Sequence, residues 1–152
     1  FSKRGNQPDY SIAFIGFTAE EAGLIGSYHY VKDPFFPLDK IEFLMNIDLM
    51  GGGKEGIMAV NGKVFEEEFT KLSQLNEQGG YLPQVKKRGA AANSDHYFFY
   101  EEDVRCFFCY LMEDYPHYHD IHDKPGELSY TNYEAAFNLF VDFAESFGSG
   151  KK

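Results

Sequence analysis

Acidic and histidine side chains at three places in the sequence could perform metal or acid–base chemistry. Glu20 and Glu21 follow one apolar run, Asp48 lies near the end of a second, and a later stretch, 117–122, holds three histidines. Carboxylates and imidazoles are ligands that zinc accepts, and a carboxylate beside a metal can act as a general base. Taken alone, the glutamate pair could equally stabilise the positive end of a helix. Asp48 within an apolar run requires a hydrogen-bond network or a cation, because burying an unpaired carboxylate is costly.

The elements that must position these residues predict an α/β fold. Apolar runs rich in β-formers predict strands over 10–17, 41–50, 56–60, 82–86 and 104–111, of which 82–86 is the weakest. Apolar periodicity and end signals predict helices over 21–32, 64–77, 94–100 and 131–147. Strands alternating with helices indicate a mixed, mostly parallel central sheet with helices on both faces, and sites in such sheets form at the carboxyl ends of strands.

Three details of these elements are specific enough to test. The nearly continuous apolar run at 10–17 is typical of a central strand. Ser94 is available as the N-cap of its helix, and Thr131 with Glu134 forms a capping-box pattern, after which Gly148 can end the last helix. Between the last strand and the last helix, 113–129 has no periodicity and is expected to be a long loop.

Composition limits the class of protein. The chain has 152 residues, which suits one domain, and 14 Lys and Arg against 24 Asp and Glu give a net charge of −10. This charge repels phosphate backbones and anionic lipids, so neither nucleic acid nor a membrane surface is expected as a partner. The sequence contains no apolar stretch near the ~18 residues of a membrane span.

The two cysteines are spaced Cys-x-x-Cys, a pattern found in zinc and redox sites. Cys106 and Cys109 fall inside the predicted strand 104–111, where residues three apart point to opposite faces. We therefore predict two packed thiols without chemistry, which leaves the cellular compartment undecided.

Four segments, in order, resemble the motifs of the co-catalytic zinc aminopeptidases related to bacterial leucyl aminopeptidase. Residues 12–27 resemble the apolar strand followed by Glu-Glu-x-Gly-x-x-Gly-Ser, and 46–51 resemble Asn-x-Asp-x-x-Gly. Residues 93–97 resemble the Ser-Asp-His turn, and 118–125 resemble the Tyr-His-x-x-x-Asp-x-Pro loop. The resemblance implies a zinc-dependent aminopeptidase that removes residues from peptides with a free N-terminus, and it favours a secreted or periplasmic protein.

Carried over to this chain, the resemblance assigns a role to each acidic motif residue. It makes Glu20 the general base that takes a proton from metal-bound water and passes it to the leaving amine. Glu21 and His119 would ligate one zinc and Asp48 the other. Asp95 and Asp123 would orient ligands from the second shell. The remaining histidines, His29, His96, His117 and His122, are interpreted as structural or surface residues.

The sequence also departs from the family pattern. The pattern includes an upstream histidine and a bridging aspartate that precede the Glu-Glu strand, and neither is present here. We therefore expect 1–148 to be the C-terminal portion of one zinc-peptidase domain and 149–152 a flexible tail, with weak zinc binding and little activity from the fragment alone. Some members place a tyrosine hydroxyl shortly before Ser-Asp-His, whereas 88–93 has no tyrosine.

Two other functions remain open at this point. A glutaminyl cyclase resembles the same fold but uses one zinc to close an N-terminal glutamine. A non-catalytic binding domain could keep the fold and lose the metals. The retained Glu20, Glu21, Asp48 and His119 favour an enzyme, because a binding module has no physical need for them.

Overall fold

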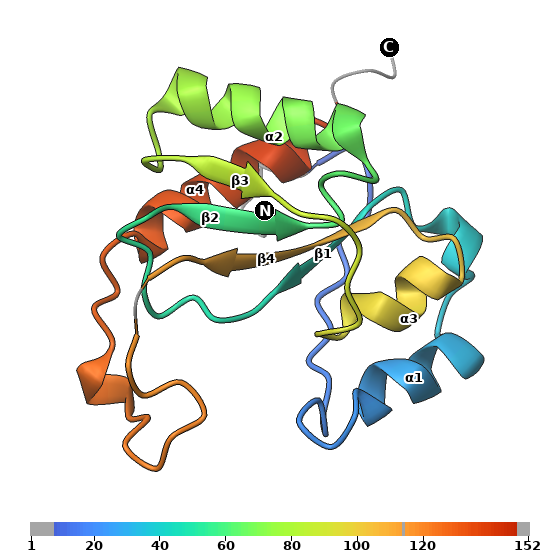
Figure 1. Ribbon diagram of the computed structural model, residues 1–152. Helices are drawn as coiled ribbons and strands as arrows, with labels where there is room; N and C mark the ends of the chain where they lie inside the picture. Colours follow the sequence, from blue (N-terminus) through green and yellow to red (C-terminus); the bar gives the residue numbers. More distant parts are fainter. Residues whose placement is uncertain (1–7, 114, 149–152) are drawn as a thin grey trace.

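The computed structural model describes residues 8–113 and 115–148, so the tail predicted at 149–152 lies outside the described residues. The strands are β1 Leu44–Ile47, β2 Ile57–Val60, β3 Val85–Lys87 and β4 Cys106–Leu111. The α-helices are α1 Ile25–Lys32, α2 Glu66–Gly79, α3 His96–Glu101 and α4 Tyr133–Glu145, with short 3-10 turns at Leu38–Lys40 and Pro125–Glu127 (Figure 1). Among these helices none is long and apolar enough to cross a membrane.

The four strands form one sheet in the order β1-β4-β2-β3. β1 pairs with β4 and β2 with β3 in parallel, whereas β2 and β4 are antiparallel. This confirms the mixed, mostly parallel sheet. The parallel neighbours β1 and β4 end at the same edge, so the segments that follow them emerge close together.

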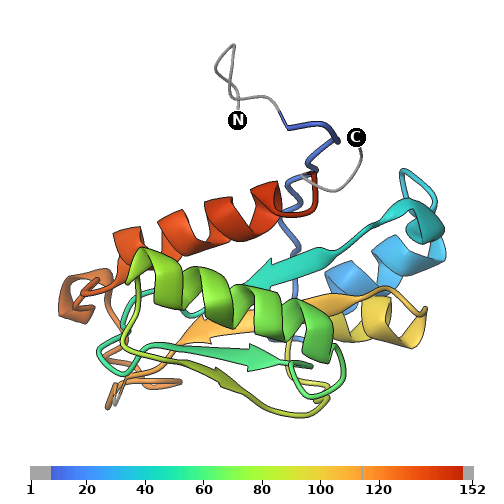
Figure 2. The same ribbon diagram turned by 90° about the horizontal axis from the view of Figure 1, so that it is seen from above.

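Helices cover both faces of the sheet, as predicted. α2 and α4 lie side by side on one face, and α1 and α3 lie together against the other at the end where β4 begins (Figures 1 and 2). The first layer encloses a core that includes Ile57, Leu72, Phe107, Leu139 and Phe143. The second encloses a smaller cluster of Tyr30, Val31, Phe99 and Val104.

Strand β4 supplies side chains to both layers. Cys109 packs in the core under α2 and α4, whereas Cys106 faces the other side, where its Sγ lies 3.4 Å from Asn61 Nδ2. Both cysteines are buried and free, which confirms the predicted packing on opposite faces. Burial raises the pKa of each thiol to about 12, so both stay protonated at neutral pH.

The segment 10–17 is not the central strand that its apolar run predicted. No backbone hydrogen bond joins it to a strand of the described chain, and Phe14 and Ile15 are 85% and 41% exposed. Phe17 alone of the run packs into the cluster under α1 and α3. An extended run becomes a strand only when a neighbouring strand satisfies its backbone groups, and the apolar pattern does not specify that neighbour.

The helix ends also differ from the prediction. α1 begins at Ile25, four residues later than expected, because Gly23 and Leu24 have φ values of 103° and 58° and turn the chain before the helix starts. The capping box of α4 does not form, since Asn132 is the N-cap and the Thr131 hydroxyl donates to Ser129 Oγ instead. The N-cap position of α3 is Asp95, not Ser94.

Truncating a core aromatic side chain on α4 should show how much the packing of this helix contributes to the stability of the fold. Phe143 is fully buried against Phe43 and Phe107, so Phe143→Ala should cost about 3–5 kcal/mol of unfolding free energy in urea titrations. Phe137→Ala, on the same helix but 60% exposed, is the matched control and should change it by about 0.5 kcal/mol or less. Equal losses in the two variants would contradict this packing.

Candidate active site

A tight turn positions the glutamate pair. The carbonyl of Glu20 accepts hydrogen bonds from the amides of Gly23 and Leu24 at 3.0 and 2.8 Å, and Ala19 has a φ of 58°. Glycine is required at 26, because a Cβ there would lie 2.4 Å from the Thr18 carbonyl oxygen. The turn therefore holds both carboxylates before α1 and not in its first turn, so the interpretation of the pair as a helix-dipole feature is wrong.

Asp48 lies immediately after β1, but it is exposed and not buried as its apolar surroundings had suggested. Its Oδ1 accepts a hydrogen bond of 2.7 Å from the amide of Leu49, whose φ is 54°. Its own amide donates to the Cys109 carbonyl at 3.3 Å. The end of β4 thus holds this carboxylate, which needs no buried partner because it faces solvent.

Polar side chains connect the second and third motifs. Asn46 Nδ2 donates to Ser94 Oγ at 2.7 Å, which fixes the turn that carries Asp95 against β1. Asp95 is buried, and its Oδ1 has no hydrogen-bond partner among the described residues. Burial raises the pKa of Asp95; the Ser27 hydroxyl opposes this effect, and the nearby charge of Asp48 adds to it.

The long loop after β4 brings His119 to the glutamate pair. Its Nδ1 lies 3.9 Å from Oε1 of Glu21, although the two residues come from opposite ends of the chain. His119 has a φ of 58°, and its ring packs at 4.1 Å between centroids against Tyr118. Ala19, Leu49 and His119 are three of the seven non-glycine residues with positive φ in the described chain, and this backbone conformation costs free energy at each of them.

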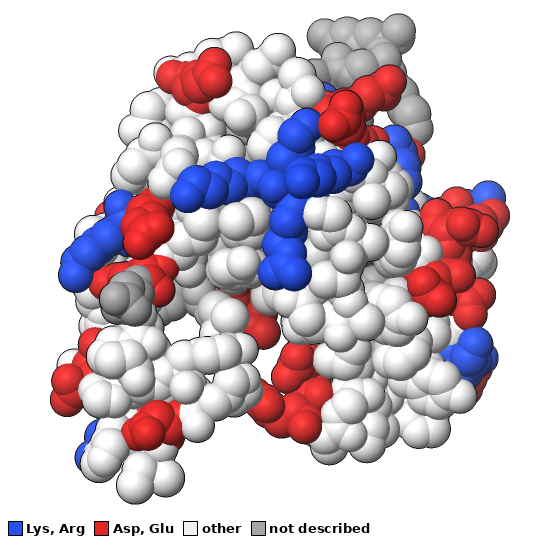
Figure 3. All heavy atoms as spheres, viewed as in Figure 1, with Lys and Arg blue, Asp and Glu red and all other residues white. Residues whose placement is uncertain are grey.

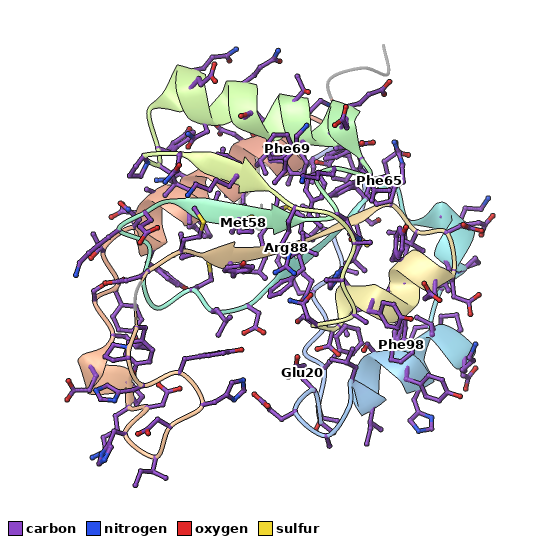
Figure 4. All side chains as sticks on the ribbon, in the orientation of Figure 1. Glu20, Met58, Phe65, Phe69, Arg88 and Phe98 are labelled. Atoms are coloured by element: carbon purple, nitrogen blue, oxygen red, sulfur yellow. The ribbon has the colours of Figure 1, made fainter. Side chains whose placement is uncertain are left out.

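The carboxylates are close enough to influence one another. The pKa of Glu20 is raised, first by partial burial and then by the charges of Glu21, Asp48 and Asp95, while His119 opposes the shift. Figure 4 shows Glu20 at the opening between the loop and α1, and Figure 3 shows acidic side chains gathered there. We call Glu20, Glu21, Asp48 and Asp95 the acid cluster. Its mutual repulsion favours a bound cation or an amine.

Other predicted residues lie apart from this cluster. Asp123 Oδ1 accepts a hydrogen bond of 2.9 Å from the Tyr115 hydroxyl, and no hydrogen bond joins it to His119 among the described residues. His117 and His122 pack on each other within the loop. His29 is exposed on α1 beside Tyr28. The orienting role expected of Asp123 stays a prediction.

The described residues match zinc in type but not in number. No three His, Cys, Asp or Glu side chains among them stand close enough together to hold one ion. Glu21 and His119 could supply two donors to one ion and Asp48 one donor to another, whereas each sound zinc site has three or four. The unpartnered Oδ1 of Asp95 is an acceptor of the kind that orients a metal-binding imidazole.

Sequence reasoning missed Tyr118 and Ser27. The pKa of Tyr118 is raised by burial and by the charges of Glu21, Asp48 and Glu20, and its ring packs against His119. Ser27 is fully buried, and its hydroxyl donates to the Leu24 carbonyl at 3.1 Å. Ser27 lies in the first of the four motifs and Tyr118 in the fourth, and their place in these motifs is the feature by which the sequence could have identified them.

Comparison with known proteins identifies a matching family and solved structures with the same fold. The family model described as Peptidase family M28 matches residues 1–144. The LapA aminopeptidase of Legionella pneumophila superposes with a TM-score of 0.74 at 24% identity, covering 91% of this chain and 40% of that one. BSAP, a zinc aminopeptidase from Bacillus subtilis, gives 0.70 at 23%, covering 90% and 36%. A glutaminyl cyclase from an Acidobacteriales bacterium gives 0.67 at 20%, covering 84% and 47%. These structures share the fold, and the chain spans less than half the length of each.

His96, the residue after Asp95, should make the free energy of unfolding depend on pH. Burial lowers the pKa of His96 to about 4, against a smaller opposing effect of the Ser94 and Ala91 backbone. The unfolded chain binds this proton below about pH 6.5 and the folded chain only near pH 4, so stability is complete above 6.5 and is lost as pH falls toward 4. Urea unfolding should show about 2 kcal/mol lost between pH 7 and pH 5 through this group. His96→Gln should remove that part of the loss, and His122→Gln, at an exposed histidine, should retain it; the same pH dependence in both variants would contradict the assignment.

Proposed function

This chain belongs to peptidase family M28, and on that premise we propose that it supplies the general base and part of the zinc ligands of an aminopeptidase. The observation that carries the proposal is the approach of His119 to Glu21 at 3.9 Å beside Glu20. Residues 1–148 would form the C-terminal portion of the catalytic domain, since the described residues lack a complete ligand set.

Each residue of the site has a separate task in this proposal. Glu21 and His119 would hold one zinc and Asp48 the other, and a bound zinc would polarise the scissile carbonyl and lower the pKa of water. Glu20 accepts the proton of the attacking water and transfers it to the leaving amine. The acid cluster attracts the α-amino group of a peptide, which limits cleavage to its first residue.

Zinc binding should follow the ligands assigned here. Calorimetric titration of the 152-residue chain should give weak binding that is lost in Glu21→Ala and in His119→Ala, because each variant removes one of two donors to the same ion. His122→Ala, in the same loop but packed against His117, is the matched control and should bind as the wild type does. Two tightly bound zinc ions would mean instead that the chain carries a complete ligand set.

Hydrolysis should depend on Glu20 without any change in metal content. In a protein that contains this chain together with a complete ligand set, Glu20→Gln should lower kcat on an aminoacyl anilide by about 100-fold or more, since the amide cannot accept the proton. Zinc content, measured by atomic absorption, should stay at the wild-type level.

Other outcomes of this assay distinguish the alternatives. Full activity in Glu20→Gln would remove the proposed base. Loss of ammonia from a peptide that begins with glutamine, without release of its first residue, would favour a glutaminyl cyclase. Absence of both activities in a zinc-loaded protein would favour a binding domain.

A further inference from the structure

A group of basic side chains lies along the free edge of the sheet. Lys86 and Arg88 are exposed and lie two residues apart on and just after β3, so they point to the same side, opposite α2. Lys63 is joined to this edge by a 3.1 Å hydrogen bond from its amide to the Arg88 carbonyl. We call Lys63, Lys86 and Arg88 the basic strip. Figure 3 shows basic side chains gathered over this part of the sheet.

The basic strip has no internal counter-charge. Among the described residues Lys63, Lys86 and Arg88 form no ion pair, although the chain carries ten more acidic than basic residues. Lys87, between them in sequence, is different: it pairs with Glu66 at 2.9 Å and lies over the Phe69 ring on the α2 side. Charged residues on an edge strand can have the sole role of preventing aggregation. Residues that form ion pairs within the chain would serve that role as well, so it does not explain why these three form none among the described residues.

A continuous row of side chains connects the basic strip with the acid cluster. Lys86 is paired in register with Met58, and Met58 with Tyr110, so the three share one face of the sheet. The row continues to the acid cluster, because Ile47 is paired in register with Cys109 and the Asp48 amide donates to the Cys109 carbonyl, which places Asp48 beside Tyr110. Arg88 and Glu20 open onto this same face (Figure 4), and no helix covers it over β2 and β3 (Figure 1).

This face therefore has opposite charges at its two ends and an apolar floor between them. From β3 across β2 and β4 to Asp48 at the end of β1 is three strand spacings, or about 14 Å, which matches about four residues of extended peptide at ~3.3 Å each. A peptide amine would lie at the acidic end, and carboxylates about three to six residues later would reach the basic strip.

We infer that this face binds an extended peptide whose free N-terminus lies at the acid cluster and whose acidic side chains lie on the basic strip. The orientation of the peptide rests on the proposed aminopeptidase function, whereas the basic strip itself does not. The partner class is thus a peptide with an acidic segment shortly after its first residues. Because the net charge of the chain opposes binding of an anion, preference for such a peptide requires a local site.

The test is a binding measurement on the zinc-free 152-residue chain by fluorescence anisotropy. The probes are Leu-Ala followed by four Glu and the same peptide with four Gln, both labelled at the C-terminus. The Glu peptide should bind about fivefold or more tightly, and Lys86→Gln/Arg88→Gln should reduce this ratio to about one. Lys32→Gln/Lys40→Gln makes the same change in net charge elsewhere on the surface and should preserve the ratio.

Acetylating the peptide N-terminus separates this inference from the proposed function. Weaker binding of the acetylated Glu peptide supports the orientation of the peptide. A Glu preference that depends on Lys86 and Arg88 but not on the free amine would retain the basic strip and overturn the proposed orientation. Equal binding of the Glu and Gln peptides would overturn the basic strip and leave the aminopeptidase proposal intact. Equal affinity for a single-stranded oligonucleotide, lost in the same variant, would show a general polyanion site and overturn the peptide inference.

Discussion

The structure depends on the burial of β4 on both of its faces. Its alternating side chains enter the core under α2 and α4 on one side and contact the α3 layer on the other, so the strand lies between two packed layers. The same strand fixes the site, because the carbonyl of Cys109 holds the amide of Asp48 and the chain after Leu111 leads into the loop of His119. A displacement of β4 would therefore move both cores and both sides of the site together.

Charge is distributed unevenly over the face of the sheet that no helix covers at β2 and β3. Like charges meet at the acid cluster, where repulsion and partial burial raise the pKa of Glu20. Left-handed backbone at Ala19, Leu49 and His119 adds a further cost at the same place. The surrounding packing offsets both costs. At the other end, the basic strip is kept free of internal partners, so the two ends of this face carry opposite charges.

The sequence predicts some helices and strands more closely than others, for a physical reason. The strands at 56–60 and 104–111 and the last helix were predicted closely, because their apolar periodicity records burial against the sheet or core. The run 10–17 has the same composition but no paired neighbour, and composition does not report pairing. The start of α1 depended on left-handed φ values at Gly23 and Leu24, and Leu24 gave no sign of that conformation.

The sequence alone determined which chemical groups are available and roughly which elements carry them. The types and order of Glu20, Glu21, Asp48, Asp95 and His119 already indicated a zinc peptidase site. Only the tertiary structure decided that Glu21 meets His119, that Asp48 faces solvent, and that the basic strip shares a face with the acid cluster. Periodicity reports local burial, whereas contacts between distant segments depend on strand order and register, which follow from packing of the whole chain.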